Sequence, residues 1–561
     1  MQPRWRGTVA WTMALAAAFA CRLAFGLSHD FWFEDETQIF LIGVRHHATG
    51  AWPYFGPDVV WTRSQIPGAL QGLLVGLPMD VIAVPEAPFV LLNLLSTAAL
   101  ALLCAYVCRR LPSLPAWLVF GWALAAPWTL HYSTHVVNPS YVLPGSILFF
   151  LGFLETFPAT SAGLLRLPLA AALMGFGVCW VMQLHLSWVL LVPFAALALA
   201  ARAREGPGRF AVAAGAMAAG ALGSGSLLLP TLWRFGADAG TGGVQRNLRP
   251  HLVAPWVLAT IAGRFLSFAS LEINRFLEIT RSKRLFLLHA HPWLVPLAAV
   301  TALFGVLHPI AMAVLWFRRR AGPPEWAAIR WLAVGTVVLI YLSYFFAYEP
   351  PQAHAFYVVA PLALVYAFYS WNLIDAPRWR RVAAAALATS VAYHAGLAGV
   401  KSGRSLYHDR AVPAVAVLQR VPPVLARRRE YSMDARLDPA AGREPDVPGE
   451  ALRDLQLAAS TWSRPWGIAL WTLTVRNRAT AAAYRDVRYQ CRYRAADGRV
   501  VRESEGLLEE VVQPGTERTV EVVDGRTSEE AVSAELRLLG AEKLLPLRAA
   551  LAPAPRASAA P

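Results

Sequence analysis

Three consecutive acidic residues, Glu34, Asp35 and Glu36, follow the first apolar run of the chain within a few residues. Acidic side chains so close to lipid are costly, and they are usually retained because they do chemistry. A carboxylate beside a cavity open to the membrane could act as a general base that takes a proton from a hydroxyl group. Helix capping is the alternative, since an acid at the start of a helix through Thr37 to Val44 would stabilise its positive end.

The acids belong to the stretch from Phe31 to Pro78, which is rich in aromatic residues. Trp32, Trp52, Tyr54 and Trp61 are of the type that lies at the level of lipid headgroups. We therefore expect a loop over residues 28–87 on the outer face of a membrane protein.

Composition sets the class of the protein. The chain has 561 residues, is 56% hydrophobic and contains 21 Trp, with a mean hydropathy of +0.42. These values are typical of a polytopic membrane protein joined to a soluble part. The net charge of +15 lies largely in short arginine clusters between apolar runs, which indicates the positive-inside bias and argues against nucleic acid as a partner. The five cysteines are too dispersed for a disulfide framework or a metal motif.

Residues 1–400 are predicted to form about 11 transmembrane helices, each near the length that a bilayer requires. The first run, from Thr8 to Leu27, is interpreted as a retained helix, with a cleaved signal peptide as the alternative. The other predicted spans are 88–108, 114–130, 141–157, a pair within 167–201, 210–229, 292–317, 326–348, 356–373 and 382–400. The arginine clusters that follow or precede them place the C-terminus outside.

The apolar stretch from Leu167 to Ala201 is too long for one span. A pair of short helices hinged at Gln183 to His185 places Arg166 and the cluster beginning at Arg202 on the same, cytoplasmic side. The hinge would then lie at the outer surface.

A second outer segment is expected over residues 232–291. It contains several arginines, among them Arg246 and Arg249, and few acids. A basic segment outside the membrane opposes the usual charge bias, so it could bind an anion. An amphipathic surface helix with solvated arginines is the equally weighted alternative.

The remaining chain changes character after Lys401. Residues 401–460 are interpreted as a linker or surface segment, and 461–548 as a small extracytoplasmic all-β domain, sandwich-like, because alternating strands are separated by turns. Asp497-Gly498 predicts a hairpin and Pro514-Gly515 another turn. The pattern of this tail resembles the FxLyD kind of bacterial sandwich domain, which implies interaction more than catalysis. The Ala- and Pro-rich end, 549–561, is predicted to be disordered.

The order of motifs in the first 400 residues resembles the membrane glycosyltransferases of the C-type (GT-C) superfamily that use polyprenyl-phosphate sugars, including protein O-mannosyltransferases and aminoarabinose transferases. The resemblance is carried by Asp35-Glu36 after the first helix, by GAWPYFGP and SQIPGAL, by QLHLS at Gln183 to Ser187, and by His354 to Tyr357 with Pro361. Thr37-Gln38 departs from the pattern. So does the lack of a second Asp-Glu pair in a later loop, which weakens the case for a metal site.

The resemblance implies roles for particular residues. Asp35 would be the catalytic base and Glu36 a supporting or acceptor-binding group. The residues expected to bind the donor phosphate or the substrate are Arg63, His185, Arg246, Arg249, His354 and Tyr357. No metal ligand is predicted, and the absence of a metal is compatible with the chemistry, because arginine alone can stabilise a phosphate leaving group. A divalent metal stays open as an alternative.

The sequence thus predicts an integral inner-membrane enzyme that moves a sugar from a polyprenyl-phosphate donor to a glycan, lipid or protein acceptor at the extracytoplasmic face. Two other classes stay open. One is a lipid or glycan transporter, which usually carries ionisable residues inside its spans. The other is a non-enzymatic membrane scaffold that displays the β domain.

Overall fold

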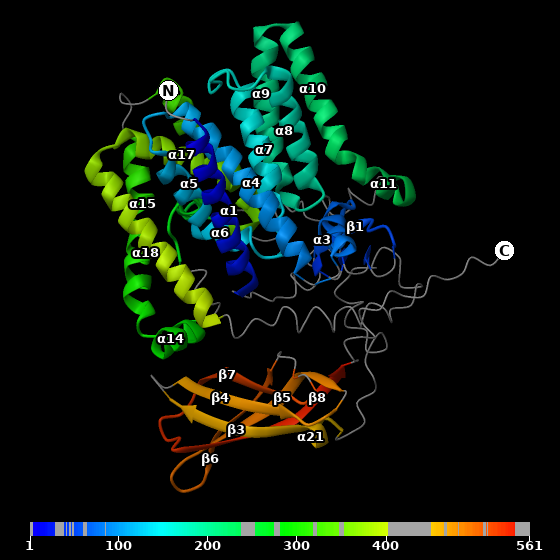
Figure 1. The fold of residues 1–561 in the computed structure, drawn as a ribbon, viewed down its shortest axis with the longest axis vertical. Helices are drawn as coiled ribbons and strands as arrows, with labels where there is room; N and C mark the ends of the chain where they lie inside the picture. The colour runs from blue at the N-terminus through cyan, green and yellow to red at the C-terminus, as the bar shows by residue number, and fades with distance from the viewer. Residues whose placement is uncertain are drawn as a thin grey trace, which may run out of the picture. The chain divides into compact units, whose positions relative to one another are not determined.

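The structure is a computed structural model of the full chain. It describes residues 4–28, 39–40, 42–43, 46–47, 50–59, 64–82, 84, 86–137, 139–236, 253–273, 281–317, 323–346, 353–401, 450–464, 468–480, 482–508, 512 and 514–544. The chain divides into two compact units, a helical one that holds most of residues 1–404 and a second one that holds residues 405–561 with two short earlier segments. Figure 1 shows the helices of the first unit and the strands of the second.

The helical unit contains long apolar helices, as predicted. Within the described ranges, eight helices are long and apolar enough to cross a membrane. They are α1 (Arg4–Ser28), α4 (Ala87–Arg110), η2 with α9 (Leu186–Leu191, Val192–Glu205), α10 with η3 and α11 (Pro207–Gly225, Ser226–Leu228, Leu229–Phe235), α15 (Leu294–Trp316), α16 (Trp326–Tyr344), η4 with α17 (Ala353–Val359, Ala360–Leu373) and α18 (Pro377–Lys401). The polytopic membrane class is confirmed.

Shorter apolar helices complete this unit. They are α3 (Leu70–Val81), α5 (Ala116–Ala125), α7 (Val142–Thr156), α8 (Leu167–Met182) and α13 (Val257–Ser267). Each span predicted from sequence falls on one of these long or short helices. The range 114–130 was predicted as one span, but it contains two helices, α5 and α6 (Pro127–Tyr132). Pro127 lacks the backbone N–H that would continue α5, so the helix breaks there.

Helices α8 and α10 pack with their backbones in contact (Figure 1). A Cβ atom on Gly175 would collide with the carbonyl oxygen of Met217, and one on Gly220 would collide with that of Ala172. Glycine at such points is the usual means by which membrane helices approach closely.

The basic clusters gather at one end of the helical unit. Arg110, at the end of α4, donates to the carbonyl of Thr160. Arg202, near the end of α9, donates to the carbonyl of Thr156 at 2.6 Å, and Arg380 of α18 donates to that of Ser113 at 3.2 Å. The charge pattern therefore placed these helix ends together correctly.

The second unit contains a β-sandwich. Strands β3 (Leu455–Ser463), β4 (Ile468–Asn477) and β7 (Glu517–Arg526) form one antiparallel sheet in the order β3-β4-β7. Strands β5 (Ala483–Arg494), β6 (Val500–Leu508) and β8 (Ser533–Leu544) form the other in the order β6-β5-β8 (Figure 1). Helix α21 (Glu450–Asp454) precedes β3, and α14 (Arg281–Ala290) is also assigned to this unit. The predicted turns are present, with φ of +82° at Gly498 and +70° at Gly515.

Side chains from both sheets form one core, which includes Trp471, Tyr493 and Leu536. Inside it, Trp471 donates to the hydroxyl of Tyr493 at 2.8 Å, and that hydroxyl donates to Asp524 at 2.6 Å. Ser504 donates to the same carboxylate at 2.5 Å. The buried acid therefore joins strands of the two sheets.

Two features differ from the predicted domain limits. Strand β3 starts at Leu455, so folded structure begins inside the range 401–460 that was interpreted as linker. The segment 232–291, predicted as an outer loop, contains α13 within the helical unit. Residues 402–449 and 545–561, and with them the predicted disordered end, lie outside the described residues.

Candidate functional site

The predicted site divides into residues that the structure describes and residues that it does not. Asp35, Glu36, Arg63, Arg246 and Arg249 all lie outside the described residues. The described residues that flank them, together with His185, His354 and Tyr357, define the site.

A small hairpin follows the acidic stretch. Strands β1 (Phe55–Val59) and β2 (Ser64–Pro67) are antiparallel, and Gly68 donates its N–H to the carbonyl of Tyr54 at 2.9 Å. That carbonyl also accepts from the hydroxyl of Thr231 at 2.6 Å. The guanidinium of Arg234 lies 4.8 Å from the centre of the Tyr54 ring and donates to its hydroxyl at 2.9 Å. The W-P-Y turn is thus fixed to α11.

The QLHLS motif forms the predicted hinge between α8 and η2. The side-chain amide of Gln183 donates to the carbonyls of Cys179 at 3.1 Å and Ser224 at 2.8 Å. Gly68 of the hairpin lies against this side chain, so two motifs far apart in the sequence meet here.

His185 is held in one tautomer by the same hinge. Its Nδ1 accepts the backbone N–H of Ser187 at 3.1 Å and lies 2.8 Å from the Ser187 hydroxyl. A nitrogen that accepts a backbone N–H carries no proton, so Nε2 carries the proton of the neutral ring. Burial lowers the pKa of His185 to about 3, with a further contribution from the neighbouring His354. The ring is therefore a neutral hydrogen-bond donor at physiological pH.

His354 and Tyr357 lie on η4, which packs against η2. His354 is partly buried and interacts with His185. Tyr357 is fully buried, and its hydroxyl donates to the carbonyl of Trp128 at 3.2 Å. Because the Tyr357 hydroxyl is bonded to the protein, Tyr357 supports the site by packing and does not present its hydroxyl to a substrate.

An aromatic cluster surrounds Tyr357. The rings of Trp128 and Tyr132 on α6 stack 5.3 Å apart, and Phe268 meets Trp128 edge to face at 4.7 Å. Trp128 also donates to Glu272 at 3.0 Å, and Glu272 forms an ion pair with Arg264 at 2.5 Å. Arg264 is one of the arginines of the basic segment, and its positive charge is neutralised by Glu272.

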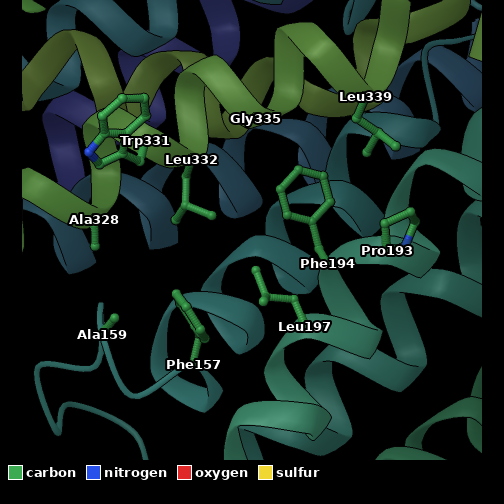
Figure 2. Close-up of a pocket in the computed structure, with 10 residues that line it drawn as sticks. All are labelled: Phe157, Ala159, Pro193, Phe194, Leu197, Ala328, Trp331, Leu332, Gly335 and Leu339. Atoms are coloured by element: carbon green, nitrogen blue, oxygen red, sulfur yellow. The ribbon is translucent and has the colours of Figure 1, made fainter. Parts of the chain in front are cut away.

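An apolar groove lies between α9, α16 and the end of α7 (Figure 2). Its volume is about 440 Å³ and only apolar residues line it. Pro193, Phe194 and Leu197 come from α9, Phe157 and Ala159 come from the end of α7 and the turn after it, and the rest come from α16: Ala328, Trp331, Leu332, Gly335 and Leu339. Figure 2 shows Pro193 and Leu339 at one end of the groove and Ala159 and Ala328 at the other.

The Pro193 end of the groove is the end nearer to His185. Residues 186–191 form η2 and run directly into α9, which starts at Val192. At 1.5 to 2.0 Å per helical residue, this connection spans only about 12 to 16 Å. A long apolar chain in the groove could therefore have its polar end at the hinge.

The structure also reveals Arg22 of α1, which the sequence showed only as an interruption of an apolar run. Arg22 is buried and lies close enough to Tyr357 to interact with it electrostatically. An arginine inside an otherwise apolar span was the available signal. Across the described ranges, no three His, Cys, Asp or Glu side chains are placed to hold a metal ion.

Comparison with solved structures shows a likeness of fold. No protein-family model matches the chain, and no curated protein matches it. One solved structure that is similar is the crystal structure of ArnT from Cupriavidus metallidurans bound to undecaprenyl phosphate, with 12% sequence identity and a TM-score of 0.45. The similarity covers 73% of this chain and 79% of that chain. A likeness at this level supports no conclusion about activity.

Proposed function

We propose that the protein is an integral membrane glycosyltransferase that transfers a sugar from a polyprenyl-phosphate donor to an acceptor at the extracytoplasmic face. The observation that carries the proposal is the apolar groove whose Pro193 end follows the His185 hinge by eight residues along the chain. It offers a path within the spans for a prenyl chain, and the polar hinge offers groups for a phosphate and a sugar.

Asp35 is the proposed general base. Its carboxylate takes the proton of the acceptor hydroxyl while the hydroxyl oxygen attacks the anomeric carbon. The bond from that carbon to the phosphate oxygen breaks, and its electron pair leaves with the polyprenyl phosphate. Attack opposite to the leaving group inverts the anomeric centre.

The other predicted residues support this step. Glu36 binds or orients the acceptor. The phosphate charge is stabilised by Arg63, Arg246, Arg249 and His354, because a cationic or hydrogen-bonding group is most effective where charge develops in the transition state. The neutral Nε2–H of His185 suits a sugar hydroxyl or a phosphate oxygen, since it donates without needing to be charged.

The first experiment measures sugar transfer by the full chain in lipid nanodiscs, with a polyprenyl-phosphate sugar as donor. Asp35→Asn should lower kcat by about a hundredfold or more, as is typical when a general base is removed. Glu36→Gln should have a smaller effect. Comparing surface glycans in cells that express both variants at equal levels tests the same step in vivo. An unchanged Asp35→Asn would favour the scaffold or transporter class.

A second experiment tests the groove. Gly335 of α16 lines the groove, and a Cβ atom there would meet no atom within 4 Å. Gly335→Phe should fill the groove and raise the KM for the donor with little change in kcat. Gly215→Phe on α10 is the matched control, because a Cβ atom at Gly215 also meets open space and Gly215 does not line the groove. Equal KM values for the two variants would place the prenyl chain elsewhere.

A further inference from the structure

We propose that Arg22 and Gly26 of α1 are positioning residues, which dock the last turns of α1 onto the α6 region and so fix where the acidic segment starts. The inference rests on the proposed function, because it concerns the placement of Asp35. Neither residue is expected to touch the substrate.

The docking surface is created by the break at Pro127. Without the proline N–H, carbonyl oxygens near the end of α5 lose their helical partners. The Thr129 hydroxyl donates to the carbonyls of Ala123 at 2.6 Å and Ala126 at 3.0 Å. The carbonyl of Leu124 accepts from Arg22 instead.

Arg22 reaches three acceptors on this broken helix. Besides Leu124, its guanidinium donates to the carbonyl of Thr129 at 3.0 Å and to the hydroxyl of Ser133 at 2.5 Å. Its side chain is buried, and no ion pair with a carboxylate is present among the described residues. A charged group is costly inside a membrane span, and spanning the bilayer does not require one. The cost is offset here because Arg22 donates to the carbonyl of Leu124, which the end of α5 leaves without a helical partner, and to the carbonyl of Thr129 in α6.

Phe25 and Gly26 continue the same face of α1, three and four residues beyond Arg22. A Cβ atom on Gly26 would collide with the carbonyl oxygen of Thr134. That oxygen also accepts from the side-chain amide of Asn93 on α4, at 3.3 Å. The ring of Phe25 meets those of His131 and His135 edge to face at 5.0 and 5.9 Å. The turn after α6 is therefore clamped between α1 and α4.

The clamp lies close to the proposed base along the chain. Helix α1 ends at Ser28, two positions beyond Gly26. From Ser28, the chain can carry Asp35 no further than about 25 Å, at about 3.5 Å per extended residue. A shift of α1 at Gly26 therefore moves the origin of the segment that contains Asp35. A displacement of about 1 Å can cost a hundredfold in rate when the reacting groups must be aligned.

The test uses Gly26→Ala with Gly215→Ala as control. Both replace a glycine within an apolar helix, but a Cβ atom at Gly215 meets no atom within 4 Å. In nanodiscs, Gly26→Ala should lower kcat at least tenfold and leave the KM for the donor within twofold of wild type, whereas Gly215→Ala should behave as wild type. Arg22→Gln should also lower kcat, and Arg22→Lys should restore part of it, because the ammonium can donate to some of the same acceptors.

Hydrogen exchange separates this inference from the proposed function. Exchange of the backbone amides between residues 29 and 38 should change in Gly26→Ala and not in Gly215→Ala, whether or not the protein transfers sugar. Wild-type protein that shows no transfer would overturn the proposed function and leave this readout intact. The positioning role is overturned if exchange is the same in both variants, or if the kcat of Gly26→Ala equals that of wild type.

Discussion

Gly68 lies directly against the side chain of Gln183, where a Cβ atom on Gly68 would sit 2.5 Å from Cγ and 2.7 Å from Oε1. Gln183 cannot easily move away, because its amide donates to two backbone carbonyls, that of Cys179 in α8 and that of Ser224 in α10. The contact joins the hairpin after the acidic stretch to the hinge that carries His185. The two regions should therefore respond together to a change at either residue.

We expect Gly68→Ala to disturb this junction. Gly68 has a φ of +120°, which disfavours any other residue, and the added methyl group would also collide with Gln183. Gly163→Ala is the control, because Gly163 has a φ of +71° and open space around it. Gly68→Ala should be less stable than Gly163→Ala by about 1 to 3 kcal/mol, the usual cost of overpacking. Thermal unfolding in detergent measures the difference, and equal stabilities would argue against the contact.

His185 should contribute to the dependence of stability on pH. Its pKa is about 3 in the folded protein, below the value of about 6.5 expected in the unfolded chain. The unfolded chain therefore binds the extra proton first, and the folded state loses stability as pH falls from about 6.5 towards 3.

The measurement is the melting temperature at pH 7 and at pH 5. It should fall less in His185→Gln than in wild type, while the exposed His289→Gln should match wild type. Sugar transfer by His185→Gln should be slowed about tenfold, as expected for one lost hydrogen bond to a charged group. A rate that keeps the wild-type value would remove His185 from the site.

Glu155 should stabilise the end of the helical unit that carries the basic clusters. Its buried carboxylate accepts from Tyr106 at 2.7 Å, from Ser161 at 3.2 Å, and from the backbone N–H groups of Ala162 and Leu164 at 3.3 and 3.1 Å. Glu155→Ala leaves these donors without an acceptor, at a cost of about 1 to 3 kcal/mol. Unfolding should occur at a lower temperature than in Glu86→Gln, the control at the residue that precedes α4. A neutral effect would mean that water replaces the carboxylate.

In the β domain, Tyr493→Phe should destabilise the sandwich by about 1 to 3 kcal/mol, because Trp471 and the buried Asp524 both lose a hydrogen-bond partner. Replacing the exposed Thr461 by Val should change stability little. Denaturant unfolding followed by tryptophan fluorescence compares the two variants. If Tyr493→Phe unfolds like Thr461→Val, the network does not join the sheets energetically.

Much of the fold could be predicted because its signals are local. Apolar runs of sufficient length gave the helices, and Arg166 with the Arg202 cluster required a hinge at Gln183 to His185, which the structure confirms. Alternation and the Asp497-Gly498 turn gave the sandwich.

Long-range contacts could not be predicted in this way. The residues that neighbour Gly68 in the sequence do not reveal its contact with Gln183. Those that neighbour Arg22 do not reveal its hydrogen bond to the Leu124 carbonyl at the end of α5. Pro127 could have predicted the break, but it lies within a continuous apolar run, and that run favoured a single span over 114–130. The site remains a prediction at Asp35 and Glu36, since the acidic stretch lies outside the described residues.

The glycines at positions 175 and 220 set a limit on how this protein can vary. Lipid-facing positions on α8 and α10 need only remain apolar, so they should tolerate many apolar substitutions. At these two positions a saturation library should recover glycine almost alone. Among natural variants, Gly175 and Gly220 should stay glycine while the neighbouring lipid-facing residues vary.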